Sequence, residues 1–323
     1  MGGNVFTATG KIKKEDIKPT LLNFLKEFKR LFPAAEPHFR QMQTLGSAGK
    51  KEVSGDIDLA ISDQSFDKIQ DWGLDQQHVQ ELFELFKKRS RTASEDQLMK
   101  RAVIVAIAEK IQEADTNLAV DVKGSSAGAL FLQAPQFNQA GEQLDKNVQI
   151  DINVGDLDWL KFAYYSSAIG KKTDNDSADD SVEMKGLHRT QLLVTLFANK
   201  GYIFSHNYGV KNKDTQEVEA KTPTQAIELL NKLYGADFSN EILENYFSII
   251  EALKKNLSEQ DLNRVYDIYL KILDSTRADI PEDLQDYWIA SQERLQLKGK
   301  FLPNKEANPR DEYISKLIKY QKK

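Results

Sequence analysis

The stretch Leu45-Gly46-Ser47-Ala48-Gly49-Lys50-Lys51-Glu52-Val53-Ser54-Gly55-Asp56-Ile57-Asp58-Leu59-Ala60-Ile61 decides how the chain is interpreted. It begins with a Gly-Ser pair, passes through a short basic turn with further glycines, and enters an apolar run through Asp-Ile-Asp. The alternation of polar and apolar residues from Asp56 predicts a strand with both aspartates on one face. The stretch therefore predicts a phosphate-binding loop followed by a metal-binding strand.

A second strand with the same alternation is predicted at Val148-Gln149-Ile150-Asp151-Ile152-Asn153-Val154. One of its faces is apolar and the other is polar, so Asp151 faces away from the apolar side. If this strand lies beside the first, Asp151 can join Asp56 and Asp58 in a cage of oxygen ligands for two hard cations.

Such a cage suits phosphoryl or nucleotidyl transfer. Two Mg²⁺ ions about 3.5 to 4 Å apart would activate an attacking hydroxyl and neutralise charge on the transferring group. Gly46 lets the backbone approach a phosphate closely, Ser47 offers a hydroxyl and an amide donor, and Lys50 or Lys51 can supply a cation. An Asp-x-Asp pair or a lysine pair by itself is more typical of a solvated turn. The prediction of a transfer site depends on the combination of the Gly-Ser loop with the three aspartates.

Other kinds of catalytic site are excluded by residue usage. The chain has no cysteine, which excludes thiolate nucleophiles, disulfides and cysteine-bound zinc. Its four histidines lie far apart in the sequence and have no metal-ligand spacing, so carboxylates must hold any metal. There is no Gly-x-Ser-x-Gly elbow, and the Gly46 segment lacks the spacing of a Walker loop.

Composition indicates a soluble protein of about two domains, since 323 residues exceed the usual size of one. No apolar run approaches the roughly 20 residues that span a bilayer, and the N-terminus lacks a signal-peptide pattern, so we expect a cytoplasmic protein without membrane contact. The net charge of −5 argues against coating of nucleic acid by bulk electrostatics. A local basic groove that binds nucleic acid is still compatible with a negative net charge.

Apolar periodicity places further elements along the chain. Helical spacing predicts helices over 18–32, twice between 79 and 111, over 187–199 and 224–234, and throughout the part beyond 235. Alternation predicts strands over 118–124 and 129–132, and a hairpin within 202–220. The acidic, weakly hydrophobic stretch 171–183 is typical of a mobile loop.

These residues resemble the DNA polymerase beta nucleotidyltransferase superfamily, and within it the family X polymerases. Three carboxylates of that family's motif match Asp56, Asp58 and Asp151. Lys123-Gly124 and the strand to Gln133-Ala134-Pro135 resemble the family's palm hairpin, and Lys200-Gly201-Tyr202 with the following hairpin is similar to its thumb. Tyr164-Tyr165-Ser166-Ser167 resembles its Tyr-Phe-Thr-Gly segment beside the incoming nucleotide. The resemblance covers residues 40 to 235.

The resemblance implies an α+β fold in four parts. Residues 1–40 would form an N-terminal helical segment, and 41–160 a nucleotidyltransferase palm, which is a mixed or antiparallel sheet flanked by helices. Residues 161–235 would form a thumb-like subdomain that binds nucleotide and acceptor. Residues 236–323 would form a C-terminal helical domain.

The resemblance also implies roles for single residues. Asp56 and Asp58 would ligate both Mg²⁺ ions, for which Mn²⁺ could substitute, while Asp151 would bind the catalytic ion and orient or deprotonate a primer hydroxyl. The nucleotide-binding residues would be Gly46, Ser47, Lys50, Lys51, Tyr164, Tyr165, Ser166, Ser167 and Arg189. For the tyrosines packing is the alternative, and for Arg189 it is a solvated position on a helix. We expect His188 to cap or pack rather than to catalyse.

Several features depart from the family. Only about 40 residues precede the palm, without a glycine-rich helix-hairpin-helix motif. Lysines stand where the phosphate loop of the family often has arginines, and an acidic insertion follows Ser167. A helical part of about 85 residues is appended. These departures argue against templated gap filling on DNA.

The resulting hypothesis is Mg²⁺-dependent transfer of a nucleotide from an NTP or dNTP to a hydroxyl, foremost the 3′ end of a nucleic acid. One alternative is transfer to a protein or small-molecule acceptor, or second-messenger synthesis, which the missing DNA-binding module and the acidic charge favour. The other is a non-catalytic binding or assembly protein that keeps the fold. The sequence does not indicate the oligomeric state.

Overall fold

The computed structural model describes residues 6, 9–90, 93–125, 128–166, 186–276 and 278–297. The chain forms two compact units. The first consists of Met1–Ala168 and His206–Gly209, and the second of Ile169–Ser205 and Val210–Lys323. The expected N-terminal segment and palm thus fall in the first unit, and the expected thumb-like and C-terminal parts fall almost entirely in the second.

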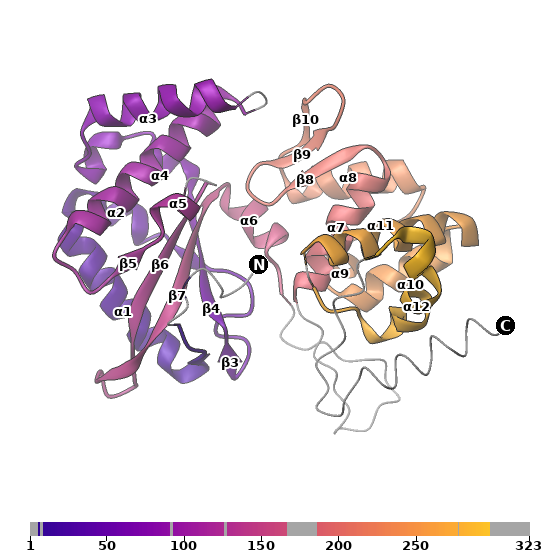
Figure 1. Cartoon of the computed structure of the whole chain (residues 1–323), viewed down its shortest axis with the longest axis horizontal. Helices are drawn as coiled ribbons and strands as arrows, with labels where there is room; N and C mark the ends of the chain where they lie inside the picture. The colour runs from indigo at the N-terminus through magenta and orange to yellow at the C-terminus, as the bar shows by residue number, and fades with distance from the viewer. Residues whose placement is uncertain are drawn as a thin grey trace. The chain divides into compact units, whose positions relative to one another are not determined.

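A five-stranded sheet with the order β2-β4-β7-β6-β5 organises the first unit (Figure 1). Its strands are β2 (Gln43–Thr44), β4 (Asp56–Ser62), β5 (Ala119–Val120), β6 (Ala129–Phe137) and β7 (Gln143–Gly155). Strands β4 and β7 run parallel, and the other neighbours are antiparallel. The expectation of an α+β fold with a mixed sheet is therefore confirmed, and the two carboxylate-bearing strands are direct neighbours.

Helices α1 (Lys14–Leu31) and α4 (Glu95–Glu113) pack on the apolar face of this sheet. The pleat of β4 and β7 sends Ile57 and Ile152 into one buried core with Phe28 of α1 and Ile107 of α4. Removing such side chains from water stabilises the layers by about 25 cal/mol per Å² of apolar surface. The polar face of the same strands is thereby left for the site.

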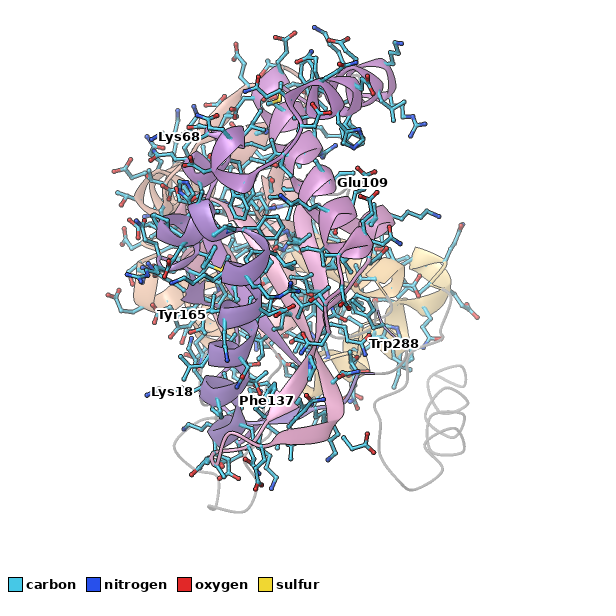
Figure 2. All side chains as sticks on the ribbon, turned by 90° about the vertical axis from the view of Figure 1, so that its left-hand side faces the viewer. Lys18, Lys68, Glu109, Phe137, Tyr165 and Trp288 are labelled. Atoms are coloured by element: carbon cyan, nitrogen blue, oxygen red, sulfur yellow. The ribbon has the colours of Figure 1, made fainter. Side chains whose placement is uncertain are left out.

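The beginning of α1 is joined to the end of β6. The hydroxyl of Thr20 accepts a hydrogen bond of 2.9 Å from the backbone amide of Phe137. Figure 2 shows Lys18 near this end of α1 and Phe137 close to it at the end of the strand. The remaining elements of the first unit are β1 (Ile12–Lys13), η1 (Pro33–Ala35), α2 (Glu36–Phe39), β3 (Val53–Ser54), η2 (Asp63–Phe66), η3 (Ile69–Trp72), α3 (Gln76–Arg89), α5 (Val122–Ser125) and α6 (Leu157–Ala163).

Two local expectations need correction. The first helix was expected over 18–32 but begins at Lys14, because acidic residues in its first turn favour a helix N-terminus and Pro19 is accommodated inside it. The strand expected over 118–124 is limited to Ala119–Val120. Asp121 accepts hydrogen bonds from the backbone amides of Gly124 and Ser125, which turns the chain into α5 instead of continuing the ladder.

The second unit is built around α7 (Gly186–Asn199), whose apolar residues Leu192, Leu193, Leu196 and Phe197 are buried. Its other elements are β8 (Tyr202–Ser205), β9 (Gly209–Asn212), β10 (Val218–Ala220), α8 (Pro223–Tyr234), α9 (Asn240–Leu243), α10 (Tyr246–Asn256), α11 (Glu259–Thr276), η4 (Glu282–Leu284) and α12 (Gln285–Leu295). The helices expected over 187–199 and 224–234 are confirmed, and the expected hairpin region forms a three-stranded sheet, β10-β9-β8, in which β10 and β9 are antiparallel. The acidic stretch 171–183 lies outside the described residues.

Candidate active site

Asp58 and Asp151 lie directly opposite each other on the parallel strands β4 and β7. The same register pairs Asp56 with Gln149. Paired residues of neighbouring strands point to the same face, and the strands are about 4.8 Å apart, so the three carboxylates share the polar face. Asp151 is only 3% exposed. The predicted facing of all three aspartates is confirmed.

Burial and mutual repulsion disfavour the ionised forms of these carboxyl groups. Burial raises the pKa of Asp58 to about 8, and the charges of Asp56 and Asp151 add to the rise. Burial likewise raises the pKa of Asp151 to about 7, against the lowering effect of a hydrogen bond from Gln149. A cation at this face would relieve the repulsion, because it favours the ionised forms.

The chemistry of the three donors fits a hard divalent cation. They supply only carboxylate oxygens, which Mg²⁺ prefers over nitrogen or sulfur ligands. Within the described ranges, however, no group of three or more acidic, histidine or cysteine side chains is already arranged around a metal position. The aspartates therefore form a set of suitable donors rather than a closed cage.

Two amides occupy the same face as the carboxylates. Nε2 of Gln149 donates to both oxygens of Asp151, at 2.8 and 3.1 Å. Asn153 is 3% exposed and lies beside Asp58, where it counteracts the rise in the pKa of that carboxyl. The alternation of residues 148–154 predicts both amides on the polar face and gives them no function. Their spacing of two residues on either side of Asp151 is the signal that could have connected them with the site.

The predicted phosphate loop is attached to β4 at Asp58. The amide of Leu45 donates to the carbonyl of Asp58 at 2.8 Å. Gly46 has a φ of +62°, and a Cβ atom there would lie 2.9 Å from Oδ2 of Asp58. The carbonyl of Ser47 then closes a turn by accepting from the amide of Lys50 at 3.0 Å. Gly46 is thus required both for its backbone conformation and for the close approach to the carboxylate.

Lys50 joins this loop to the segment that follows α6. Its Nζ donates to the carbonyl of Ser166 at 2.8 Å and lies 4.7 Å from the ring centroid of Tyr165. Gly46 and Tyr165 also form an isolated parallel β-bridge. The structure therefore brings the predicted residues of both segments together, with Lys50 directed at protein groups. Lys51 is partly buried, and Ser167 lies outside the described residues.

Tyr164 lies close enough to Asp58 and Asp151 for their charges to affect the pKa of its hydroxyl. Burial raises the pKa of its hydroxyl well above the usual value, and Asp58 and Asp151 add to the rise. The hydroxyl donates to Oδ1 of Asn207 at 3.3 Å, a contact between residues 43 positions apart. A Cβ on Gly155 would lie 2.8 Å from the carbonyl oxygen of Asn207, so this glycine lets Asn207 fit against the end of β7. Sequence reasoning did not find Asn207.

His188 and Arg189 belong to the helical core of the second unit. Arg189 is 3% exposed, and its Nε donates to the carbonyl of Leu243 at 2.6 Å, which ties α7 to α9. Nδ1 of His188 lies 3.1 Å from the hydroxyl of Tyr269. Packing by His188 is confirmed, and a solvated position for Arg189 is wrong. The predicted contact of Arg189 with a nucleotide stays a prediction.

Comparison with known proteins does not place the chain in a family. No protein-family model matches it, and no curated protein does. Among the helices that the structure describes, none has both the length and the apolarity to cross a membrane.

Proposed function

We propose that the chain is a Mg²⁺-dependent nucleotidyltransferase of the DNA polymerase beta type, with Mn²⁺ as a substitute metal. The observation that supports this most is the pairing of Asp58 with Asp151 in register, directly beside Gly46 of the Gly-Ser loop. This places acidic oxygen donors next to backbone amides that suit a phosphate. A solvated Asp-x-Asp turn would have neither the buried partner nor the loop.

In the proposed reaction a substrate hydroxyl attacks the α-phosphorus of an NTP or dNTP. A new P–O bond forms as the bond to pyrophosphate breaks, and the hydroxyl proton passes to a carboxylate. Asp151 suits this role, because it stands opposite Asp58 on the polar face, and a bound cation would hold its carboxylate in the ionised form that accepts a proton. When bound, Mg²⁺ would neutralise charge on the triphosphate and acidify the attacking hydroxyl.

The remaining predicted residues have supporting roles in this proposal. Gly46 and Ser47 would face the triphosphate with their backbone amides, and Tyr164 and Tyr165 would border the sugar. Lys50 would hold the loop against Tyr165 and Ser166, in accordance with its contacts. The proposed site thus combines two chain segments that only the fold brings together.

Replacement of both Asp56 and Asp58 by alanine tests the proposal. We expect loss of nucleotide transfer with retained secondary structure, because the substitutions remove donors from a half-polar face and leave the core intact. Asp145→Ala is the matched control, since Asp145 is an exposed aspartate at the far end of β7. Transfer by the double variant at the wild-type rate would refute the proposed site.

The acceptor is proposed to be the 3′ end of a nucleic acid. The net charge of −5 favours a smaller acceptor, such as a second nucleotide in second-messenger synthesis, or a protein hydroxyl. Incubation of the protein with labelled NTPs and dNTPs, together with DNA ends, RNA ends or no added acceptor, separates these products. A protein that binds neither Mg²⁺ nor nucleotide at millimolar concentrations would instead be a non-catalytic member of the fold.

A further inference from the structure

Gln149 is a fully buried polar residue that the proposed reaction does not use. Its residue surface is 0% exposed, and it stands directly opposite Asp56 in the β4–β7 register. Its amide nitrogen makes two hydrogen bonds to the carboxylate of Asp151. A buried amide is costly to place in a sheet unless it is paired, so this arrangement calls for a physical explanation.

The two hydrogen bonds restrict the rotation of the Asp151 carboxylate. A carboxylate has about four lone-pair sites on its two oxygens, and Gln149 uses two of them. Because one nitrogen faces both oxygens, the amide fixes the plane of the group, and a cation would bind through the lone pairs on the outer sides of the oxygens.

The neutral charge of Gln149 is also informative. An arginine or lysine at this position would hold the carboxylate at least as firmly, but its positive charge would oppose a cation at the same face. An amide donor orients Asp151 and leaves the negative charge of the site intact. This combination is expected where a carboxylate must be held in place for a metal ion.

We infer that Gln149 is a positioning residue that orients Asp151 toward the divalent cation. The inference rests on the metal site of the proposed function, and it concerns metal affinity rather than the identity of the acceptor. Hydrogen-bond partners of metal ligands typically contribute a factor of about 10 to 100 in metal affinity or activity.

The test is calorimetric titration of the full chain with Mg²⁺, and separately with Mn²⁺, in the absence of nucleotide. Gln149→Met preserves the length of the side chain and removes the donor, so we expect cation affinity to fall by about 10- to 100-fold. Gln143→Met is the matched control. Gln143 is an exposed glutamine at the beginning of β7, away from Asp151 along the strand, and we expect wild-type affinity for this variant.

Activity gives a second measurement. In Gln149→Met the half-saturating Mg²⁺ concentration for transfer should rise by the same factor, while the KM for nucleotide at saturating Mg²⁺ stays unchanged. Excess Mg²⁺ should restore kcat. If Gln149 had only a structural role, Gln149→Met would lower the amount of folded protein, and excess Mg²⁺ would not restore kcat.

Unchanged cation affinity in folded Gln149→Met overturns the inference. If that variant does not fold, Gln149→Asn keeps the amide but shortens the side chain by one methylene, and its affinity decides in the same way. Weakened binding in the variant, with no transfer by wild-type protein to any acceptor, supports the inference and rejects the proposed function. Absence of cation binding by wild-type protein overturns the inference.

Discussion

Gly46 approaches Asp58 so closely that a Cβ atom on residue 46 would lie 2.9 Å from the carboxylate oxygen Oδ2. Real Cβ atoms do not tolerate such a contact, so any side chain here must displace the loop or the carboxylate. The proposed phosphate loop and the proposed metal-binding strand therefore cannot move independently of each other. Two features that are 12 positions apart in the sequence depend on each other's position.

Gly46→Ala should abolish most Mg²⁺ binding and transfer, because the new methyl group pushes against Oδ2 of Asp58. Gly49→Ala is a close control: Gly49 also has a positive φ, +77°, but nothing lies within 4 Å of its Cβ position. Both variants should lose roughly 1–2 kcal/mol of stability through backbone strain. Thermal unfolding and Mg²⁺ titration distinguish strain from contact. Equal loss of Mg²⁺ binding in the two variants would show that the contact with Asp58 is unimportant.

The metal-free protein should lose stability as pH rises from about 4 to about 8. The folded pKa of Asp58, about 8, and that of Asp151, about 7, exceed the unfolded value near 4. Between these values the folded state binds more protons than the unfolded state, so the free energy of unfolding falls with increasing pH. The contribution is complete below about pH 4 and is lost as pH passes through the folded values.

Asp58→Asn should flatten this dependence, and saturating Mg²⁺ should raise stability most at the alkaline end for wild-type protein. Denaturant unfolding at a series of pH values measures both effects, with EDTA in the metal-free samples. The difference between wild type and variant isolates Asp58 from other titrating groups. A difference that stays constant from pH 4 to pH 8 would contradict the raised pKa of Asp58.

Lys50→Met should weaken nucleotide binding by loosening the loop from Tyr165 and Ser166. Tyr165→Leu removes the ring under the ammonium group and should have a similar effect on the KM for nucleotide. Because both substitutions break one contact, the double variant should be less impaired than the sum of the single effects. The loss of stability should be below about 1 kcal/mol, as for an exposed cation–π pair. Fully additive changes in KM would indicate that Lys50 acts directly on the phosphates.

Arg189→Met should destabilise the second unit by about 1–3 kcal/mol, since it leaves the buried carbonyl of Leu243 without this donor. If Arg189 only packs, the KM for nucleotide at a temperature well below unfolding stays at the wild-type value. Lys221→Met, at an exposed residue before α8, controls for the loss of a positive charge. A large rise in the KM for nucleotide in Arg189→Met, with no rise in Lys221→Met, would support the predicted contact of Arg189 with the nucleotide.

The periodicity of the sequence predicted much of the fold, because strands and helices each bury their apolar residues at a characteristic spacing. The alternation around Asp56 and Asp151 placed the aspartates on the polar faces of their strands, and helical spacing placed α7 and α8 within one or two residues. Periodicity failed at Asp121, whose side chain and carbonyl accept hydrogen bonds from the amides of Gly124 and Ser125 and so end the strand. Such local competition depends on individual contacts that the pattern of apolar residues does not contain.

The sequence by itself determined which residues face polar surroundings and which chemistry they permit, because side-chain direction in a strand follows from its period of two. Only the tertiary structure decided that β4 and β7 are parallel neighbours in a register that pairs Asp58 with Asp151. It also decided that Lys50 is directed at Ser166. These contacts join segments that are distant in the chain. Strand pairing and packing of the whole core select them, and local sequence does not encode them.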